Sequence, residues 1–157
     1  MKLSDGAPRI ARMVAQDVRV GFGCDGEASS ANRDLLREAR HGSYLQKVET
    51  LDATVLPAGQ CYSMLTEVGM RALGYRDLGR LAPGCTADFS LVRTDDLCTT
   101  NRRRILTNLL YAGSGYQIDS VFVAGQPVLR GGSFLHHDLG RVLEQCERIL
   151  ARLETRL

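Results

Sequence analysis

Apolar and polar residues alternate along one early stretch of the chain in the way that is typical of a β-strand. Val18, Val20 and Phe22 would lie on one side of an extended segment, with Gly21 on the other side. The alternation stops at Asp25, and a stretch rich in glycine, serine and alanine follows it. The pattern therefore predicts a strand that ends at Asp25 and opens into a polar loop.

Four other segments carry apolar residues at helical spacing, three or four positions apart. They cover residues 10–14, about 34–48, 61–72 and 139–153. Gly74 is placed to end the third of these helices, and Asp138 is placed to cap the start of the fourth. The fourth segment is predicted to be amphipathic, with its leucine, valine and isoleucine side chains on one face.

The stretch between the third and fourth helices has the character of a sheet. Ala87–Val92 is a short strand candidate, and Ser120–Ala124 with Pro127–Leu129 would form a hairpin around Gly125 and Gln126. A proline cannot donate to a strand ladder, so Pro127 is expected at a sheet edge or a strand start. The chain thus reads as an α/β half to about residue 76, a β-rich half, and a terminal helix.

Composition narrows the possible architectures and partners. The chain has 157 residues, whereas a complete eight-stranded α/β barrel typically needs about 250. Its 20 basic and 18 acidic residues give a net charge of +2, which provides no broad attraction for nucleic acid. No apolar run approaches the roughly 18 residues of a membrane span, and no signal peptide is recognisable, so we expect a soluble cytoplasmic protein.

The five cysteines are odd in number, scattered, and form no Cys-x-x-Cys pair. They are Cys24, Cys61, Cys85, Cys98 and Cys146. This arrangement favours reduced thiols in packing roles over a disulfide framework or a cysteine zinc site.

Asp25 is the most suggestive candidate for chemistry. An acidic side chain at the carboxyl end of a strand, before a loop of small residues, is where barrel enzymes place catalytic groups. Gly21 and Gly23 would leave space for a ligand or metal beside the backbone. The alternative is a tight turn in which the carboxylate of Asp25 caps local amides.

Several segments in order resemble the C-terminal part of the amidohydrolase superfamily. The pattern is closest to the branch that holds cytosine, guanine and methylthioadenosine/adenosylhomocysteine deaminases together with the triazine hydrolases. The matching segments are residues 2–8, 18–26, 29–35, 45–47, 66–74, 78–81, 83–84, 87–89, 109–111 and 121–128. Each segment alone is weak evidence, but their shared order is specific.

The resemblance implies an architecture for each part of the chain. Residues 1–76 would supply the last strand and helices of a (β/α)₈ TIM barrel, and residues 77–135 the C-terminal part of a composite β-sandwich beside it. Residues 136–157 would form a C-terminal helix. In the family the first strands of that sandwich come from the start of the polypeptide, and no segment of this chain matches them. The chain is therefore expected to be a C-terminal fragment of a metal-dependent hydrolase.

The resemblance also implies a metal and a role for Asp25. Family members use a divalent metal, zinc or iron, to activate water for attack on a ring carbon. Asp25 matches the aspartate that contacts this metal and the water and helps to move a proton. The family's remaining ligands, a His-x-His pair, two more histidines and a glutamate, have no counterpart here. Since catalytic zinc usually has three protein ligands, tight metal binding by this chain alone is not expected.

Other polar residues have simpler interpretations. His41, His136 and His137 lie where the family pattern uses no metal ligand, and we expect all three at the surface. The cluster Arg102–Arg104 is expected to be a solvated face or a subunit contact rather than a nucleic-acid site.

Residues near Asp25 include candidate ligand contacts and departures from the family pattern. Ser29 and Ser30 have no triad partners and would shape the loop beside Asp25, with substrate contact as a further role. Cys24 replaces the threonine that is common before the aspartate, and Met70 replaces an alanine and would need extra space.

These observations support two hypotheses. The first is the C-terminal part of a metal-dependent amidohydrolase that acts on non-peptide C–N bonds, as a deaminase or chlorohydrolase of a nitrogen heterocycle, and that is inactive as the isolated chain. The alternative is a non-catalytic α+β assembly or interaction module derived from that fold. Either would leave the apolar faces of residues 18–24 and 121–123 in need of cover, by a missing N-terminal segment or by self-association.

Overall fold

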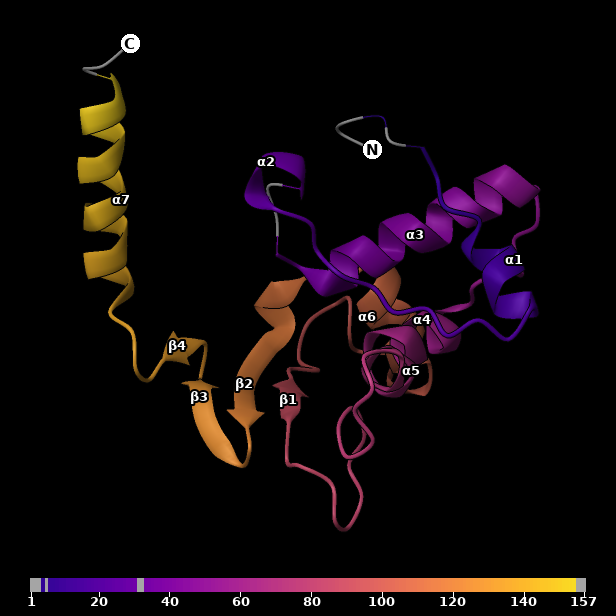
Figure 1. The fold of residues 1–157 in the computed structure, drawn as a ribbon. Coiled ribbons are helices and arrows are strands. Elements are labelled where there is room, and N and C mark those ends of the chain that lie inside the picture. Colours follow the sequence, from indigo (N-terminus) through magenta and orange to yellow (C-terminus); the bar gives the residue numbers. More distant parts are fainter. Residues whose placement is uncertain (1–3, 5, 31–32, 155–157) are drawn as a thin grey trace.

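The computed structural model describes residues 4, 6–30 and 33–154. Its helices are α1 (Ile10–Ala15), α2 (Glu27–Ser30), α3 (Leu35–Thr50), α4 (Ala58–Leu65), α5 (Glu67–Ala72), α6 (Ile105–Tyr111) and α7 (Leu139–Glu154). Its strands are β1 (Phe89–Val92), β2 (Ile118–Val123), β3 (Gln126–Arg130) and β4 (Ser133–Phe134). Figure 1 shows a helical part, a small sheet beside it, and α7 standing apart from both.

The apolar core lies in the helical part, where α3 packs against α4 and α6. Its buried members are Ile10, Ala39, Leu56, Ala58, Cys61, Met64 and Leu110. Buried polar groups on α3 are satisfied: the Ser43 hydroxyl donates to the Leu56 carbonyl at 2.9 Å. The Gln46 amide nitrogen donates to the Pro8 carbonyl at 2.8 Å. These hydrogen bonds tie the loops around α3 to a helix whose buried face is largely small and polar.

The predicted strand over residues 18–25 is not present as a strand. This segment connects α1 to α2 and passes beside α3 (Figure 1), and it pairs with none of the strands in the described part of the chain. The physical reason is that a strand is defined by hydrogen bonds to a neighbouring strand, and these residues have only helices beside them.

The packing of that segment nevertheless follows the predicted alternation. Val20 and Phe22 pack against the core. A Cβ atom on Gly42 would lie 2.5 Å from the Phe22 ring, so α3 needs glycine where the ring rests on it. On the opposite side, a Cβ atom on Gly21 would lie 3.0 Å from the Cα atom of Gly69 at the start of α5. The segment is therefore held between α3 and the α4–α5 pair.

The single helix expected over residues 61–72 is two helices. Thr66 leaves helical geometry with φ −123° and ψ −109°, and it separates α4 from α5. Its hydroxyl donates to the Tyr62 carbonyl at 2.8 Å. The break allows Gly69 to approach the backbone of Gly21, a contact that apolar spacing does not reveal.

The sheet is antiparallel throughout, in the order β1-β2-β3-β4. The hairpin between β2 and β3 is confirmed, but its turn is Ala124–Gly125, one residue earlier than expected. Both turn residues have positive φ, 49° for Ala124 and 76° for Gly125, which suits the twist of a two-residue hairpin. Phe89 and Phe122 stack across β1 and β2 with ring centroids 4.5 Å apart.

The terminal helix α7 is present as predicted, with Asp138 as its cap. The Asp138 carboxylate accepts a hydrogen bond from the Arg141 amide at 3.1 Å. Every described residue of α7 is exposed. Among the helices that the structure describes, none has both the length and the apolar content that crossing a bilayer requires.

Candidate functional site

Asp25 lies where the segment after α1 enters α2. One carboxylate oxygen accepts the Gly26 amide at 2.6 Å. That backbone hydrogen bond, followed by a hydrogen bond from the Ser29 side chain, lowers the pKa of Asp25. The side chain is exposed. Asp25 is therefore an anion at neutral pH that is fixed by its own loop and open to solvent. Such a carboxylate is accessible to a cation or a water molecule.

Other charged groups gather around the same loop. Arg33 and Glu27 form an exposed ion pair with 2.5 Å between Nε and Oε1. Asp34 caps α3 by accepting the Arg37 amide at 3.1 Å. Partial burial and then the charge of Glu38 raise the pKa of Cys24, which keeps its thiol protonated. The loop thus presents several carboxylates, one of which is neutralised by Arg33.

The structure brings Asp25 and Ser29 together and uses Ser29 as a support. The amides of Ser29 and Ser30 both donate to the Gly26 carbonyl at 3.0 Å, which forms the short helix α2. The Ser29 side chain bonds to Asp25, so the loop-shaping role expected for it is confirmed. Substrate contact by Ser29 or Ser30 stays a prediction.

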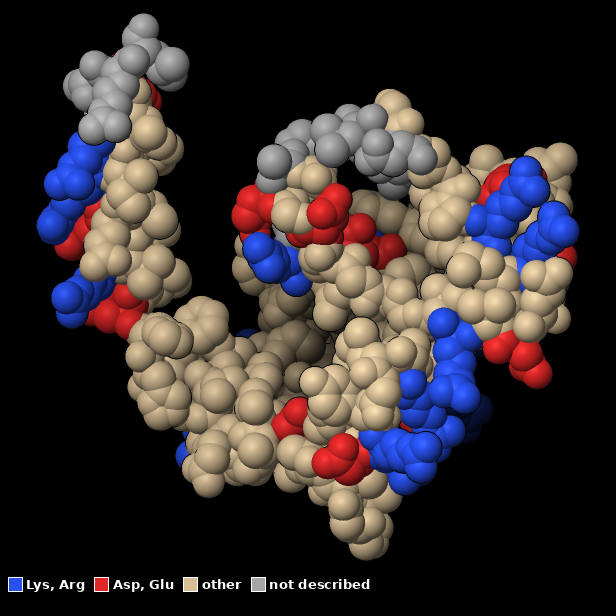
Figure 2. Space-filling model, in the orientation of Figure 1, with Lys and Arg blue, Asp and Glu red and all other residues tan. Residues whose placement is uncertain are grey.

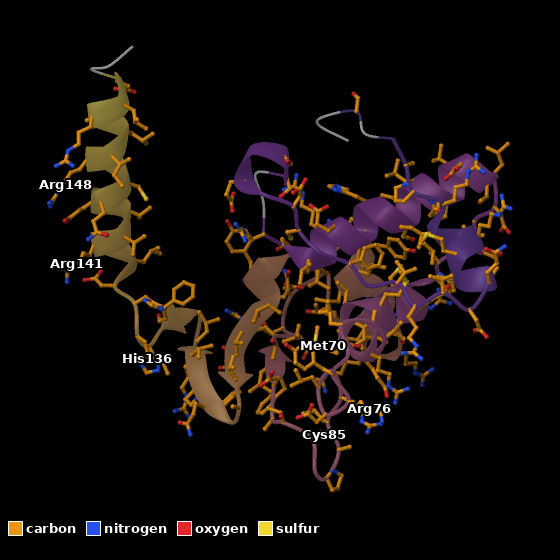
Figure 3. The ribbon with its side chains drawn as sticks, in the orientation of Figure 1. Met70, Arg76, Cys85, His136, Arg141 and Arg148 are labelled. Atoms are coloured by element: carbon orange, nitrogen blue, oxygen red, sulfur yellow. The ribbon has the colours of Figure 1, made fainter. Side chains whose placement is uncertain are left out.

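The three histidines lie on other elements than Asp25. His41 on α3 lines a hollow of about 190 Å³ together with Phe22, Gly23 and Glu38. His136 and His137 are exposed between β4 and α7, and Figure 3 shows His136 beside β4 and away from α2. Within the described ranges no three histidine, cysteine, aspartate or glutamate side chains are grouped so that they could hold a metal. The described residues therefore do not make a complete metal site.

The arginine cluster Arg102–Arg104 is a short 3₁₀ helix before α6, and none of its residues is buried. This exposure agrees with both roles that the sequence predicts for the cluster, a solvated face and a subunit contact.

Arg40 is a supporting residue that sequence reasoning missed. From α3 its Nε donates to the Leu110 carbonyl at 2.6 Å, and its terminal nitrogen donates to the Gly113 carbonyl. These bonds fix the end of α6 to the helix that begins beside the Asp25 loop. No sequence signal marks this role, because an arginine on a helix is usually solvent-exposed.

Comparison with known proteins places this geometry in a family. The amidohydrolase family matches residues 1–128. A 5-methylthioadenosine/S-adenosylhomocysteine deaminase of Halothermothrix orenii is 38% identical over 97% of this chain and 36% of its own length. A deaminase of the same name from Desulforudis audaxviator is 40% identical over 98% and 36%. A 5′-deoxyadenosine deaminase of Methanothermobacter thermautotrophicus is 38% identical over 98% and 36%.

Solved structures of a deaminase and a chlorohydrolase also superpose on this chain. An adenosine deaminase from Xanthomonas campestris with bound zinc superposes with a TM-score of 0.93 at 30% identity, covering 98% of this chain and 35% of that one. An atrazine chlorohydrolase mutant from Arthrobacter aurescens, complexed with zinc and atraton, superposes with a TM-score of 0.78 at 25% identity, covering 87% and 31%.

The chain therefore spans about a third of the length of the relatives that it matches. Its helices and small sheet correspond to one part of the amidohydrolase fold. The expected branch of deaminases and triazine hydrolases is confirmed by these relatives. This chain belongs to the amidohydrolase family.

Proposed function

We propose that the chain serves as the C-terminal third of a metal-dependent amidohydrolase that removes an amino group from an adenosine-like nucleoside. The observation that carries the proposal is the match to deaminases over nearly the whole chain, at 38–40% identity in three cases. The triazine-acting neighbour is more distant at 25% identity. Deamination of a purine is therefore preferred over dechlorination of a triazine.

Asp25 is the residue of this chain that we assign to the reaction. A divalent metal in such an enzyme supplies an activated water, and zinc is the metal bound by the solved relatives. Asp25 offers a carboxylate held by Gly26 and Ser29 in its charged form. In that form it can accept a proton from a water molecule or balance a positive charge.

The isolated chain is not expected to turn over substrate. Its described residues contain no group of three potential metal ligands, and catalytic zinc usually has three protein ligands. The remaining ligands would come from polypeptide outside these 157 residues.

The test combines this chain with the complementary polypeptide, defined as the part of the Halothermothrix orenii deaminase outside the region that this chain matches. The two are co-expressed, supplied with zinc, and assayed for ammonia release from 5′-deoxyadenosine and methylthioadenosine and for chloride release from atrazine. We expect turnover of a nucleoside by the pair and none by either piece alone. Asp25→Asn should reduce turnover by about 10²–10⁴-fold, the usual range for a lost acid–base group.

Two results would contradict the proposal. Turnover by the isolated chain would show that its own residues complete a site. A pair that assembles but releases neither ammonia from the nucleosides nor chloride from atrazine would favour a non-catalytic assembly module.

A further inference from the structure

Helix α7 carries a continuous apolar stripe that the described residues of the chain do not cover. The stripe residues are Leu139, Val142, Leu143, Cys146, Ile149, Leu150 and Leu153. They recur at intervals of three and four positions, which places them on one side of the helix. The large apolar side chains among them remain 45–57% exposed, although a stripe of this kind is normally buried against a partner surface.

The stripe faces inward, toward the rest of the molecule. Figure 2 shows the uncharged side of α7 turned to the body across open space, with its basic and acidic side chains on the far side. Figure 3 shows Arg141 and Arg148 pointing outward on that far side. A partner that covers the stripe would therefore lie between α7 and the body.

The surface area of the chain indicates how large the missing cover is. The chain exposes 11447 Å². A compact folded protein of 17.2 kDa is expected to expose about 7,800 Å². The excess of about 3,600 Å² is several times the roughly 800 Å² that one partner buries in an interface of standard size. Pairing of α7 with a second α7 would cover one helix face and leave most of that excess exposed.

The comparison with a longer protein supports a choice of occupant. The zinc-bound Xanthomonas campestris structure reproduces 98% of this chain with a TM-score of 0.93, although this region is only 35% of that protein. The matching region of that longer protein thus has the same shape as this chain, with roughly twice as much additional polypeptide around it.

We propose that the stripe of α7 is a docking surface for the polypeptide that supplies the rest of the amidohydrolase fold. This inference rests on the proposed function, since it takes the partner to be the remainder of the enzyme. The partner chemistry is an apolar protein surface that inserts between α7 and the body and that buries the stripe on its inner side.

Cys146 provides a direct probe because it lies within the stripe and is exposed. The full chain is labelled with iodoacetamide, alone and after co-purification with the complementary polypeptide, and the label is located by peptide mass analysis. We expect Cys146 to react readily in the isolated chain and at least tenfold more slowly in the pair. Leu143→Lys should prevent co-purification. Glu144→Lys, which adds the same side chain away from the stripe, should leave co-purification intact, and circular dichroism would verify that both variants keep α7 helical.

Three outcomes would overturn the docking surface. They are equal labelling of Cys146 with and without the complementary polypeptide, failure of the two pieces to associate, and a dimer of the isolated chain in which Cys146 is already protected. The outcomes separate this inference from the proposed function. Asp25→Asn should assemble with Cys146 protected and lack turnover, whereas Leu143→Lys should fail at assembly.

Discussion

Two helices of this chain, α3 and α7, have the same length of 16 residues and opposite surroundings. Helix α3 lies against α1, α4 and α6 and buries Ala39, Ser43 and Gln46. Helix α7 has the more regular apolar stripe and buries none of its residues. The difference shows that an apolar stripe indicates a helix face that needs a partner surface. Whether that face is buried depends on whether the partner is present.

The way α3 is held explains why its burial is hard to recognise from sequence. Its buried positions are one alanine and two polar residues, which pack because each polar group finds a partner. The Ser43 hydroxyl also lies 2.9 Å from the Tyr111 hydroxyl on α6. Specific hydrogen bonds, rather than large apolar side chains, fix α3 in the core.

The largest expected difference between the core around α3 and helix α7 is in the free energy of unfolding that is lost when an apolar side chain is shortened. Met64 on α4 is 2% exposed within the core that contains α3. Met64→Ala should lower the free energy of unfolding by about 2–5 kcal/mol, because it removes contacts and leaves a cavity. Leu150→Ala on α7 should change it by less than about 0.5 kcal/mol. Urea unfolding followed by circular dichroism measures both, and equal costs would mean that α7 is packed in solution.

The second comparison uses one glutamine from each helix. Gln46 is 1% exposed, accepts the Ala11 amide at 2.9 Å and donates to Pro8. Gln46→Ala leaves these backbone groups without partners and should cost about 1–3 kcal/mol. Gln145→Ala on the exposed surface of α7 should cost nothing measurable. If the Gln46→Ala chain were as stable as the wild type, the claim that hydrogen bonds fix α3 in the core would be contradicted.

The third comparison concerns the caps of the two helices. Asp34→Ala should lower global stability by about 0.5–2 kcal/mol, the usual cost of losing an N-cap. Asp138→Ala removes the same type of bond from α7. It should weaken α7 locally and speed its amide exchange without moving the main unfolding transition, because an isolated helix of this length is marginally stable. A shift of that transition by Asp138→Ala would show coupling between α7 and the body.

The smallest effect is expected in the loop that precedes α3. The Gly26 amide and then Ser29 lower the pKa of Asp25. Because the folded-state pKa is depressed, any stability that this carboxylate adds is present above its unfolded pKa and is lost as the pH falls through the folded value. Ser29→Ala should move the pKa of Asp25 upward, toward its ordinary value, as followed by carboxyl-detected NMR. A pKa unchanged by Ser29→Ala would contradict the support role of Ser29.

Local signals in the sequence were sufficient for several elements. The cap at Asp138 and the start of α3 after Asp34 were predicted because capping and periodicity are properties of short windows. The hairpin was also predicted, although its turn lies one residue earlier. The sequence does not predict helix α6, because its short apolar run directly follows three arginines.

Features that depend on distant residues were not predictable in this way. The strand over residues 18–25 requires a neighbouring strand, and the described chain provides none for it. The helix break at Thr66 allows Gly69 to approach Gly21. The apolar spacing around either glycine does not predict this contact.

At the site, the pairing of Asp25 with Ser29 followed from their closeness in sequence. Arg40 could not be found in the same way, because its partners on and after α6 lie 70 and 73 positions away.

The most direct test of the central claim is hydrogen exchange along the whole chain, with and without the complementary polypeptide. The account predicts that amides of α7 and of residues 18–25 exchange rapidly in the isolated chain and become protected in the pair. Amides at the centre of α3 should be protected in both. Protection of α7 and residues 18–25 in the isolated chain, or no change on adding the complementary polypeptide, would contradict the claim that this chain completes its fold with a partner.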